Sequence, residues 1–102
     1  MSDQFGLSTQ TIQKIQNVFS KYSNIEKEII YGSRAMGNYQ LGSDIDLTVM
    51  APLMTLSELL KIENEIDDLY LPYKLDISLY HQIENPDLKN HIERRSQIFY
   101  AP

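Results

Sequence analysis

The sequence predicts an α/β or α+β fold, in which helices cover a small β-sheet. Segments 44–50 and 73–80 alternate apolar and polar residues, as half-buried strands do. Segments 8–22 and 55–70 instead repeat apolar residues at helical spacing. Because helical and strand segments follow one another along the chain, a sheet covered by helices is the architecture that this order favours.

The first half of the chain predicts one helix, two strands and a short turn. Ser8 or Thr9 can cap the helix over 8–22, and the segment 25–31 ends in an apolar run typical of a buried strand. Residues 34–37 form at most a helical turn, and 38–43 are predicted as a loop before the strand 44–50. The apolar positions of the helix are Ile12, Ile15, Val18, Phe19 and Tyr22.

The second half continues the alternation of helices and strands. Pro52 ends the strand before it, and Thr55 or Ser57 can cap the helix over 55–70. Pro86 fits the first position of a last helix, which we expect to run to about Arg95. Residues 97–100 are predicted as a short final strand. The expected apolar stripe of the helix over 55–70 consists of Leu56, Leu59, Leu60, Ile62, Ile66 and Leu69.

Length and composition exclude several classes of protein. With 102 residues the chain suits a single domain, 1–102, with a thin core. A formal net charge of -5 argues against nonspecific coating of nucleic acid, which needs a basic surface. The absence of cysteine excludes disulfides and thiolate catalysis. No segment suits a membrane span or the apolar stretch of a signal peptide, so we expect a cytoplasmic location.

Acidic residues occupy equivalent positions in two predicted strands. Residues two apart in a strand share a face, so Asp44 and Asp46 lie opposite the apolar residues of 44–50. Asp76 and Ser78 lie opposite the apolar residues of 73–80 by the same reasoning. If these strands are neighbours, the three aspartates converge on one surface of the sheet. Such carboxylates repel one another, and a divalent cation removes the conflict.

The preferences of Mg²⁺ match this set. The ion binds hard oxygen ligands, commonly a few carboxylates together with substrate phosphates. Two such ions about 3.5–4 Å apart can stabilise the attacking and leaving oxygens of a phosphoryl displacement. The aspartates are therefore suited to hold Mg²⁺ for a phosphoryl displacement if their strands are neighbours.

A Gly-Ser pair precedes the aspartates and directly follows a predicted strand. At Gly32, which has no side chain, the backbone N–H groups of such a bend can bind phosphate oxygens. Ser33 adds a hydroxyl donor. Arg34 adds a cation that suits a phosphate. Taken singly, a Gly-Ser pair usually marks a turn, and an Asp-x-Asp is commonly a solvated edge. Their order and spacing together favour a nucleotide site.

These motifs resemble the nucleotidyltransferase superfamily that includes DNA polymerase beta. The family pattern is a Gly-Ser pair, about ten residues, an Asp-x-Asp between apolar residues, and a third Asp on a later strand. The matching residues are Gly32-Ser33, Ser43-Asp44-Ile45-Asp46-Leu47 and Leu75-Asp76-Ile77. The resemblance implies an α+β (α/β-like) nucleotidyltransferase core, a small mixed β-sheet with helices packed on it.

The small size of the chain is similar to that of the minimal nucleotidyltransferases. Such proteins often act as antitoxins beside a HEPN-domain toxin, and some transfer AMP from ATP to a tyrosine of that toxin. The resemblance implies that Asp44, Asp46 and Asp76 bind metal and take part in catalysis. It also implies two Mg²⁺ ions, and a role for Asp76 in activating the attacking hydroxyl. It implies nucleotide binding at Gly32 and Ser33, with Arg34 and Ser43 as further contacts.

Other functions stay open on the sequence alone. A non-catalytic antitoxin that binds nucleotide and covers its partner is the main alternative, and both a homodimer and a hetero-oligomer are compatible with the resemblance. A template nucleic acid is not expected, and a small-molecule acceptor is disfavoured because little chain remains to bind it. His81 and His91 lack partners spaced for zinc, so they are interpreted as structural. Lys89, His91, Arg94 and Arg95 are interpreted as a solvated basic face.

Overall fold

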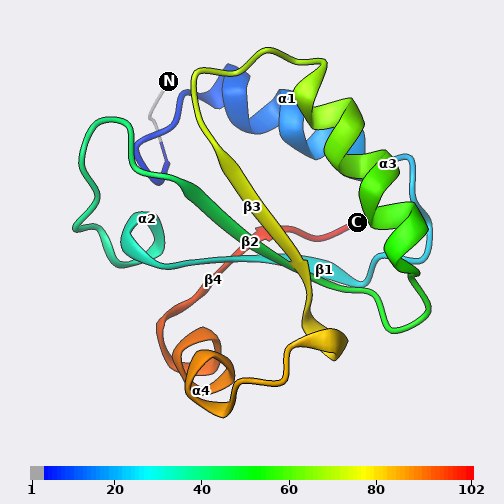
Figure 1. Ribbon diagram of the computed structural model, residues 1–102. Coiled ribbons are helices and arrows are strands. Elements are labelled where there is room, and N and C mark those ends of the chain that lie inside the picture. Colours follow the sequence, from blue (N-terminus) through cyan, green and yellow to red (C-terminus); the bar gives the residue numbers. More distant parts are fainter. Residues whose placement is uncertain (1–3) are drawn as a thin grey trace.

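The protein's computed structural model describes residues 4–102, in which helices pack on a mixed β-sheet (Figure 1). Residues 1–3, which begin the expected domain 1–102 and its N-terminal stretch, lie outside the described residues. The predicted α+β fold is confirmed. The helices are α1 (Thr9–Phe19), α2 (Ser33–Met36), α3 (Leu56–Asp67) and α4 (Pro86–Arg95), with the 3₁₀ turn η1 (Tyr80–Gln82). The strands are β1 (Lys27–Tyr31), β2 (Ile45–Met50), β3 (Leu75–Leu79) and β4 (Gln97–Tyr100).

The strands lie in the order β3-β2-β1-β4, and only one neighbouring pair is parallel. β1 is antiparallel to both β2 and β4, whereas β2 and β3 run parallel. A parallel pair needs a crossover connection, and α3 supplies it between β2 and β3. The two strands that carry the aspartate motifs are therefore direct neighbours, as the sequence analysis required.

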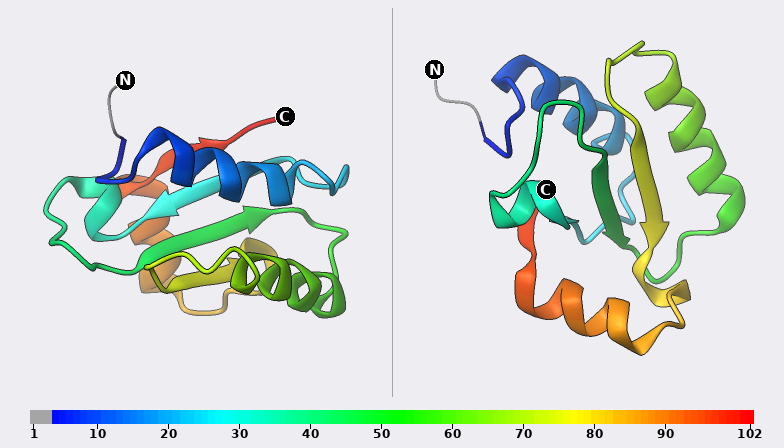
Figure 2. Two further views of the ribbon diagram at one scale, coloured as in Figure 1. Left: turned by 90° about the horizontal axis from the view of Figure 1, so that it is seen from above. Right: turned by 60° about the vertical axis from the view of Figure 1, so that its left-hand side comes forward.

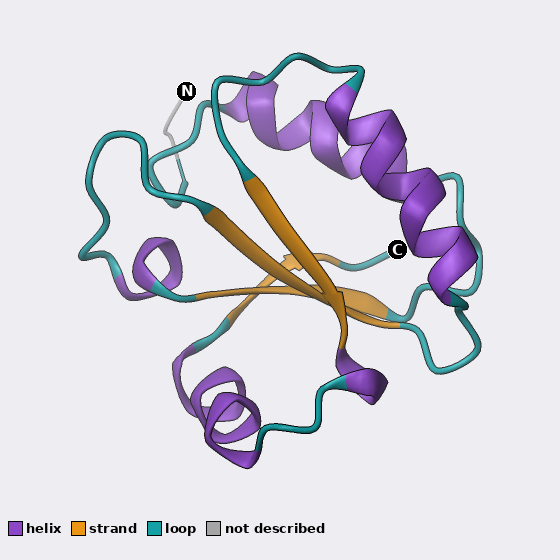
Figure 3. Cartoon of the chain, in the orientation of Figure 1, coloured by secondary structure: helices purple, strands orange, loops and turns teal. Residues whose placement is uncertain are grey.

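Helices cover the two faces of the sheet unequally. α1 and α3 pack on one face, and α4 packs on the other (Figures 2 and 3). The larger core under α1 and α3 includes Phe19, Ile30 and Leu47. The smaller core on the α4 face consists of Ile29, Tyr31 and Ile92. Within the described residues, no helix is long and apolar enough to cross a membrane.

Local capping explains where the helices begin. The Ser8 hydroxyl accepts a hydrogen bond of 3.1 Å from the Thr11 amide and so caps α1. At α3, Thr55 and Glu58 form a reciprocal capping box, in which each side chain accepts from the other residue's amide at 3.2 Å. Both caps satisfy amides that a helix N-terminus leaves without partners.

One prediction about α3 is wrong. Leu56 and Leu60 were expected in its apolar stripe, yet they are 56% and 59% exposed. The buried positions of α3 are Leu59, Ile62 and Ile66. α3 contacts the core through this narrow stripe alone, and the periodic pattern of leucines is wider than that contact.

Candidate active site

Asp46 and Asp76 lie opposite one another on neighbouring strands. The parallel register pairs Asp46 of β2 with Asp76 of β3, so the two side chains share one face of the sheet. The residues on either side of Asp46 in β2, Ile45 and Leu47, are fully buried on the other face. Asp44 directly precedes β2 and is exposed. The alternation of apolar and acidic residues thus places these carboxylates on the sparsely covered α4 face.

The electrostatics of Asp46 show that the aspartates are close enough to influence one another. Burial raises the pKa of the Asp46 carboxyl, and the negative charges of Asp76 and then Asp44 raise it further. His91 of α4 acts in the opposite direction and lowers that pKa. A cation placed among these carboxylates would relieve the repulsion.

Gly32 lies directly against Asp46. Its φ of 77° is in the region that favours glycine, and a Cβ built on it would lie 2.5 Å from Oδ2 of Asp46. Ser33 follows as the first residue of α2. The Gly-Ser bend and the aspartates are therefore on the same side of the sheet, with no side chain between Gly32 and the Asp46 carboxylate.

Arg34 and Ser43 take part in the internal structure of the loop that leads to the aspartates. Arg34 is 3% exposed. Its Nε and Nη2 donate to the Ser43 carbonyl at 3.0 and 2.8 Å, and Nη1 donates to the Phe5 carbonyl at 2.9 Å. The guanidinium also stacks on Tyr39 and Tyr73, 5.3 and 4.9 Å from their ring centroids. This placement favours a positioning role for both residues, and their contact with nucleotide stays a prediction.

Tyr31, Ser78 and His91 lie beside the aspartates, although the sequence analysis assigned none of them to the site. Tyr31, the register partner of Asp46, is buried, and its pKa is raised by burial and by the charges of Asp76 and Asp46. A hydrogen bond with Ser78 lowers that pKa. The His91 ring meets the Tyr31 ring edge-on at 6.2 Å. Tyr31 ends a uniformly apolar run, so alternation gave no signal for its face.

The aspartates offer a metal hard oxygen ligands on two adjacent strands. Among residues 4–102, no group of three acidic or histidine side chains forms a ready-made metal site. Mg²⁺ commonly binds through one or two carboxylates and takes its other ligands from water and substrate phosphates. Asp46 and Asp76, with Asp44 beside them, fit that mode of binding.

Several solved structures share this fold. A toxin–antitoxin complex with AMP-PNP superposes with a TM-score of 0.69 at 15% identity, covering 89% of this chain and 73% of that chain. A mutant MntA-HpeT toxin–antitoxin pair gives 0.68 at 13% identity, with coverages of 89% and 73%. A tri-AMPylated HEPN toxin of Shewanella oneidensis in complex with an MNT antitoxin gives 0.63 at 14% identity, with coverages of 91% and 71%.

Sequence comparison identifies the family. No curated protein matches the sequence. The family model for the polymerase beta nucleotidyltransferases matches residues 13–102, which include the Gly-Ser bend and all three aspartates. The chain therefore belongs to the polymerase beta nucleotidyltransferase family.

Proposed function

We propose that the chain is a Mg²⁺-dependent nucleotidyltransferase that moves AMP from ATP to a hydroxyl of a protein partner. The observation that supports this most directly is the register of Asp46 and Asp76 beside Gly32. The two carboxylates are suited to hold a metal ion, and the bend at Gly32 has no side chain to exclude a phosphate. A triphosphate and a metal ion therefore fit together on this face of the sheet.

Each site residue has a distinct part in this proposal. Gly32 and Ser33 bind the triphosphate, with Arg34 and Ser43 holding the loop beside it. Asp44, Asp46 and Asp76 hold Mg²⁺, which when bound neutralises charge on the phosphates. The acceptor oxygen attacks the α-phosphorus and its proton passes to the Asp76 carboxylate. The bond from the α-phosphorus to the bridging oxygen breaks, and its electron pair leaves with pyrophosphate.

The biological role that we propose is that of an antitoxin. Three of the similar structures are toxin–antitoxin complexes, one of them with AMP-PNP and one with a tri-AMPylated HEPN toxin. By analogy, the acceptor is a tyrosine hydroxyl of a HEPN-type toxin, and the added AMP neutralises that toxin. The family membership of the chain supports the reaction, and the neighbours support the partner.

Transfer of radiolabel from α-labelled ATP tests the proposal. Wild-type protein, Mg²⁺ and a co-encoded HEPN protein are expected to give a labelled partner. Asp46→Asn removes one ligand charge, so we expect transfer to fall at least about 100-fold while the fold persists. Asp68→Asn, an exposed acid outside the site, is the matched control and keeps full activity.

Equal transfer by Asp46→Asn and wild type would contradict the assignment of the site. Full neutralisation of the partner by Asp46→Asn without transfer would instead support the alternative, an antitoxin that acts by binding alone.

A further inference from the structure

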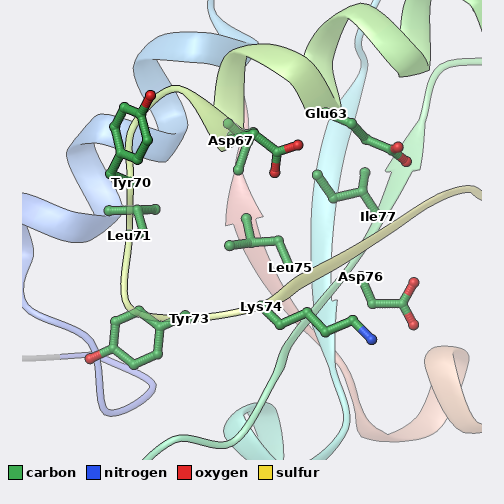
Figure 4. A pocket seen from close by; sticks show the side chains of 10 residues that line it. Glu63, Asp67, Tyr70, Leu71, Tyr73, Lys74, Leu75, Asp76 and Ile77 are labelled. Carbon is green, nitrogen blue, oxygen red and sulfur yellow. The ribbon is translucent and has the colours of Figure 1, made fainter.

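A pocket of about 540 Å³ lies between the C-terminal half of α3 and strand β3. Glu63 and Asp67 line it from α3, Tyr70 and Lys74 from the connection between α3 and β3, and Asp76 from the strand (Figure 4). This volume falls within the range of about 300–1,000 Å³ that is usual for ligand pockets. Asp76, a candidate active-site residue, is among the residues that line the pocket, so the pocket borders the strand that carries the proposed site of transfer.

The strand that borders this pocket is at the edge of the sheet. β3 pairs with β2 on one side only, and within residues 4–102 no other strand pairs with its outer edge. An edge strand presents backbone N–H and C=O groups that can pair with an added strand. Extended peptides commonly bind in this way, with backbone hydrogen bonds for affinity and pockets for alternate side chains.

The adjoining surface of α3 is half apolar and half acidic. Leu56, Leu60, Glu63 and Asp67 follow the spacing of one helical stripe, which we call the outer stripe of α3. Its first two members are the exposed leucines, and its last two line the pocket. The pocket and the exposed leucines are thus parts of one continuous surface along the helix.

Charge indicates what would bind there. Glu63, Asp67 and Asp76 outnumber Lys74 in the pocket lining, and the chain carries a formal net charge of -5. A basic segment complements such a surface, whereas an acidic segment or a nucleic acid is repelled by it.

We propose that this pocket and the free edge of β3 form the acceptor-binding groove. The groove takes an extended segment of the partner protein, which pairs with β3 and carries Lys or Arg near the acceptor hydroxyl. The basic side chains meet Glu63 and Asp67, and the hydroxyl reaches Asp76. The identity of the hydroxyl as acceptor rests on the proposed function, but the binding of a basic extended segment does not.

Peptide binding without ATP or Mg²⁺ tests the groove by itself. The probe is a fluorescein-labelled peptide with a central tyrosine and lysine at alternate positions, followed by fluorescence anisotropy. We expect Glu63→Lys/Asp67→Lys to weaken binding at least about tenfold, because two attractive charges become repulsive. Glu26→Lys/Glu84→Lys makes the same change in net charge at exposed positions elsewhere, and it is expected to bind like wild type.

Two further measurements do not depend on that double variant folding. Lys74→Glu removes the one cation of the lining and is expected to tighten binding of the peptide about threefold. A peptide with alternate backbone nitrogens methylated cannot complete the strand pairing, so it is expected to bind at least about tenfold more weakly.

The groove assignment is overturned if the peptide does not bind, or if both double variants lose affinity equally. A self-association that Glu63→Lys/Asp67→Lys abolishes, in the absence of peptide binding, would identify a second copy of the chain as the occupant and would also overturn it.

A transfer assay separates this inference from the proposed function. If the peptide binds in the groove but no AMP is transferred to the partner, the groove assignment holds and the enzyme assignment is wrong. If Glu63→Lys/Asp67→Lys transfers AMP to the partner with an unchanged KM for the acceptor, the enzyme assignment holds and the groove assignment is wrong. The expected result is a raised KM for the acceptor and an unchanged KM for ATP.

Discussion

At the scale of single residues, two separate constraints require glycine at position 32. Its φ of 77° is costly for any residue with a Cβ, and that Cβ would lie 2.5 Å from the Asp46 carboxylate. Gly37 has a similar φ of 85°, but nothing lies within 4 Å of the position that its Cβ would occupy. Comparing alanine variants at Gly32 and Gly37 therefore separates the effect of backbone strain from the effect of displacing the Asp46 side chain.

We predict that Gly32→Ala lowers AMP transfer at least about tenfold and costs about 1–3 kcal/mol of stability, because its φ of 77° and ψ of -157° are essentially restricted to glycine. Gly37→Ala, at a left-handed helical backbone, is expected to cost about 1–2 kcal/mol and to keep nearly normal transfer, because it displaces no site residue. Transfer assays measure the rate of AMP transfer by both variants, and urea unfolding measures their free energies of unfolding. Equal losses of transfer in the two variants would show that strain alone explains the effect.

At the scale of elements, a buried arginine links three segments near the site. Arg34 of α2 contacts the Phe5 and Ser43 carbonyls and stacks on Tyr73, which precedes β3. Ser43 lies near the end of the loop between α2 and β2, directly before Asp44. A planar guanidinium satisfies several acceptors in fixed directions at once, and an ammonium group does not. Arg34 therefore positions the loop relative to both aspartate-bearing strands.

We predict that Arg34→Lys mobilises this loop more than it destabilises the molecule. Amide hydrogen exchange in residues 38–44 should rise at least about tenfold, as expected for the loss of about 1.5–3 kcal/mol of charged hydrogen bonding. Exchange in α1 and α4 serves as the internal control and should change little. Unaltered exchange in the loop would mean that Arg34 does not hold it.

At the scale of the whole molecule, the larger core contains an uncompensated carboxyl. Glu28 of β1 is fully buried opposite Val49 and Tyr100, and neither side-chain oxygen has a hydrogen-bond partner. Burial holds the pKa of Glu28 well above its usual range. Since the folded pKa exceeds the unfolded one, the fold loses stability as the pH rises from the unfolded value through the folded one.

We predict that Glu28→Gln raises the melting temperature at pH 8, where ionisation of Glu28 is penalised in the fold. A gain of about 1 kcal/mol or more corresponds to about 4–8 °C for a domain of this size. The gap should close as the pH falls below about 4.5, because both states of the wild type then hold the proton. A gap that does not change with pH would contradict this account of Glu28.

Much of the fold follows from patterns that are local in sequence. The caps at Ser8 and Thr55 and the alternation in β2 and β3 predicted both the elements and the faces of Asp46 and Asp76. The burial of a side chain was harder to predict where it depends on which other elements pack against that side chain. Leu56 and Leu60 follow the helical pattern and remain exposed, while Glu28 and Arg34 are charged and become buried.

By itself, the sequence determined the order of helices and strands, the faces of the residues in β2 and β3, and the Gly-Ser and aspartate motifs of the family. Only the tertiary structure decided that β2 and β3 are parallel neighbours in a register that pairs Asp46 with Asp76. It also decided that β3 lies at the edge of the sheet, where the pocket forms. Periodicity is local and is visible in the residues themselves. Strand partners depend on contacts between distant segments, which no local pattern records.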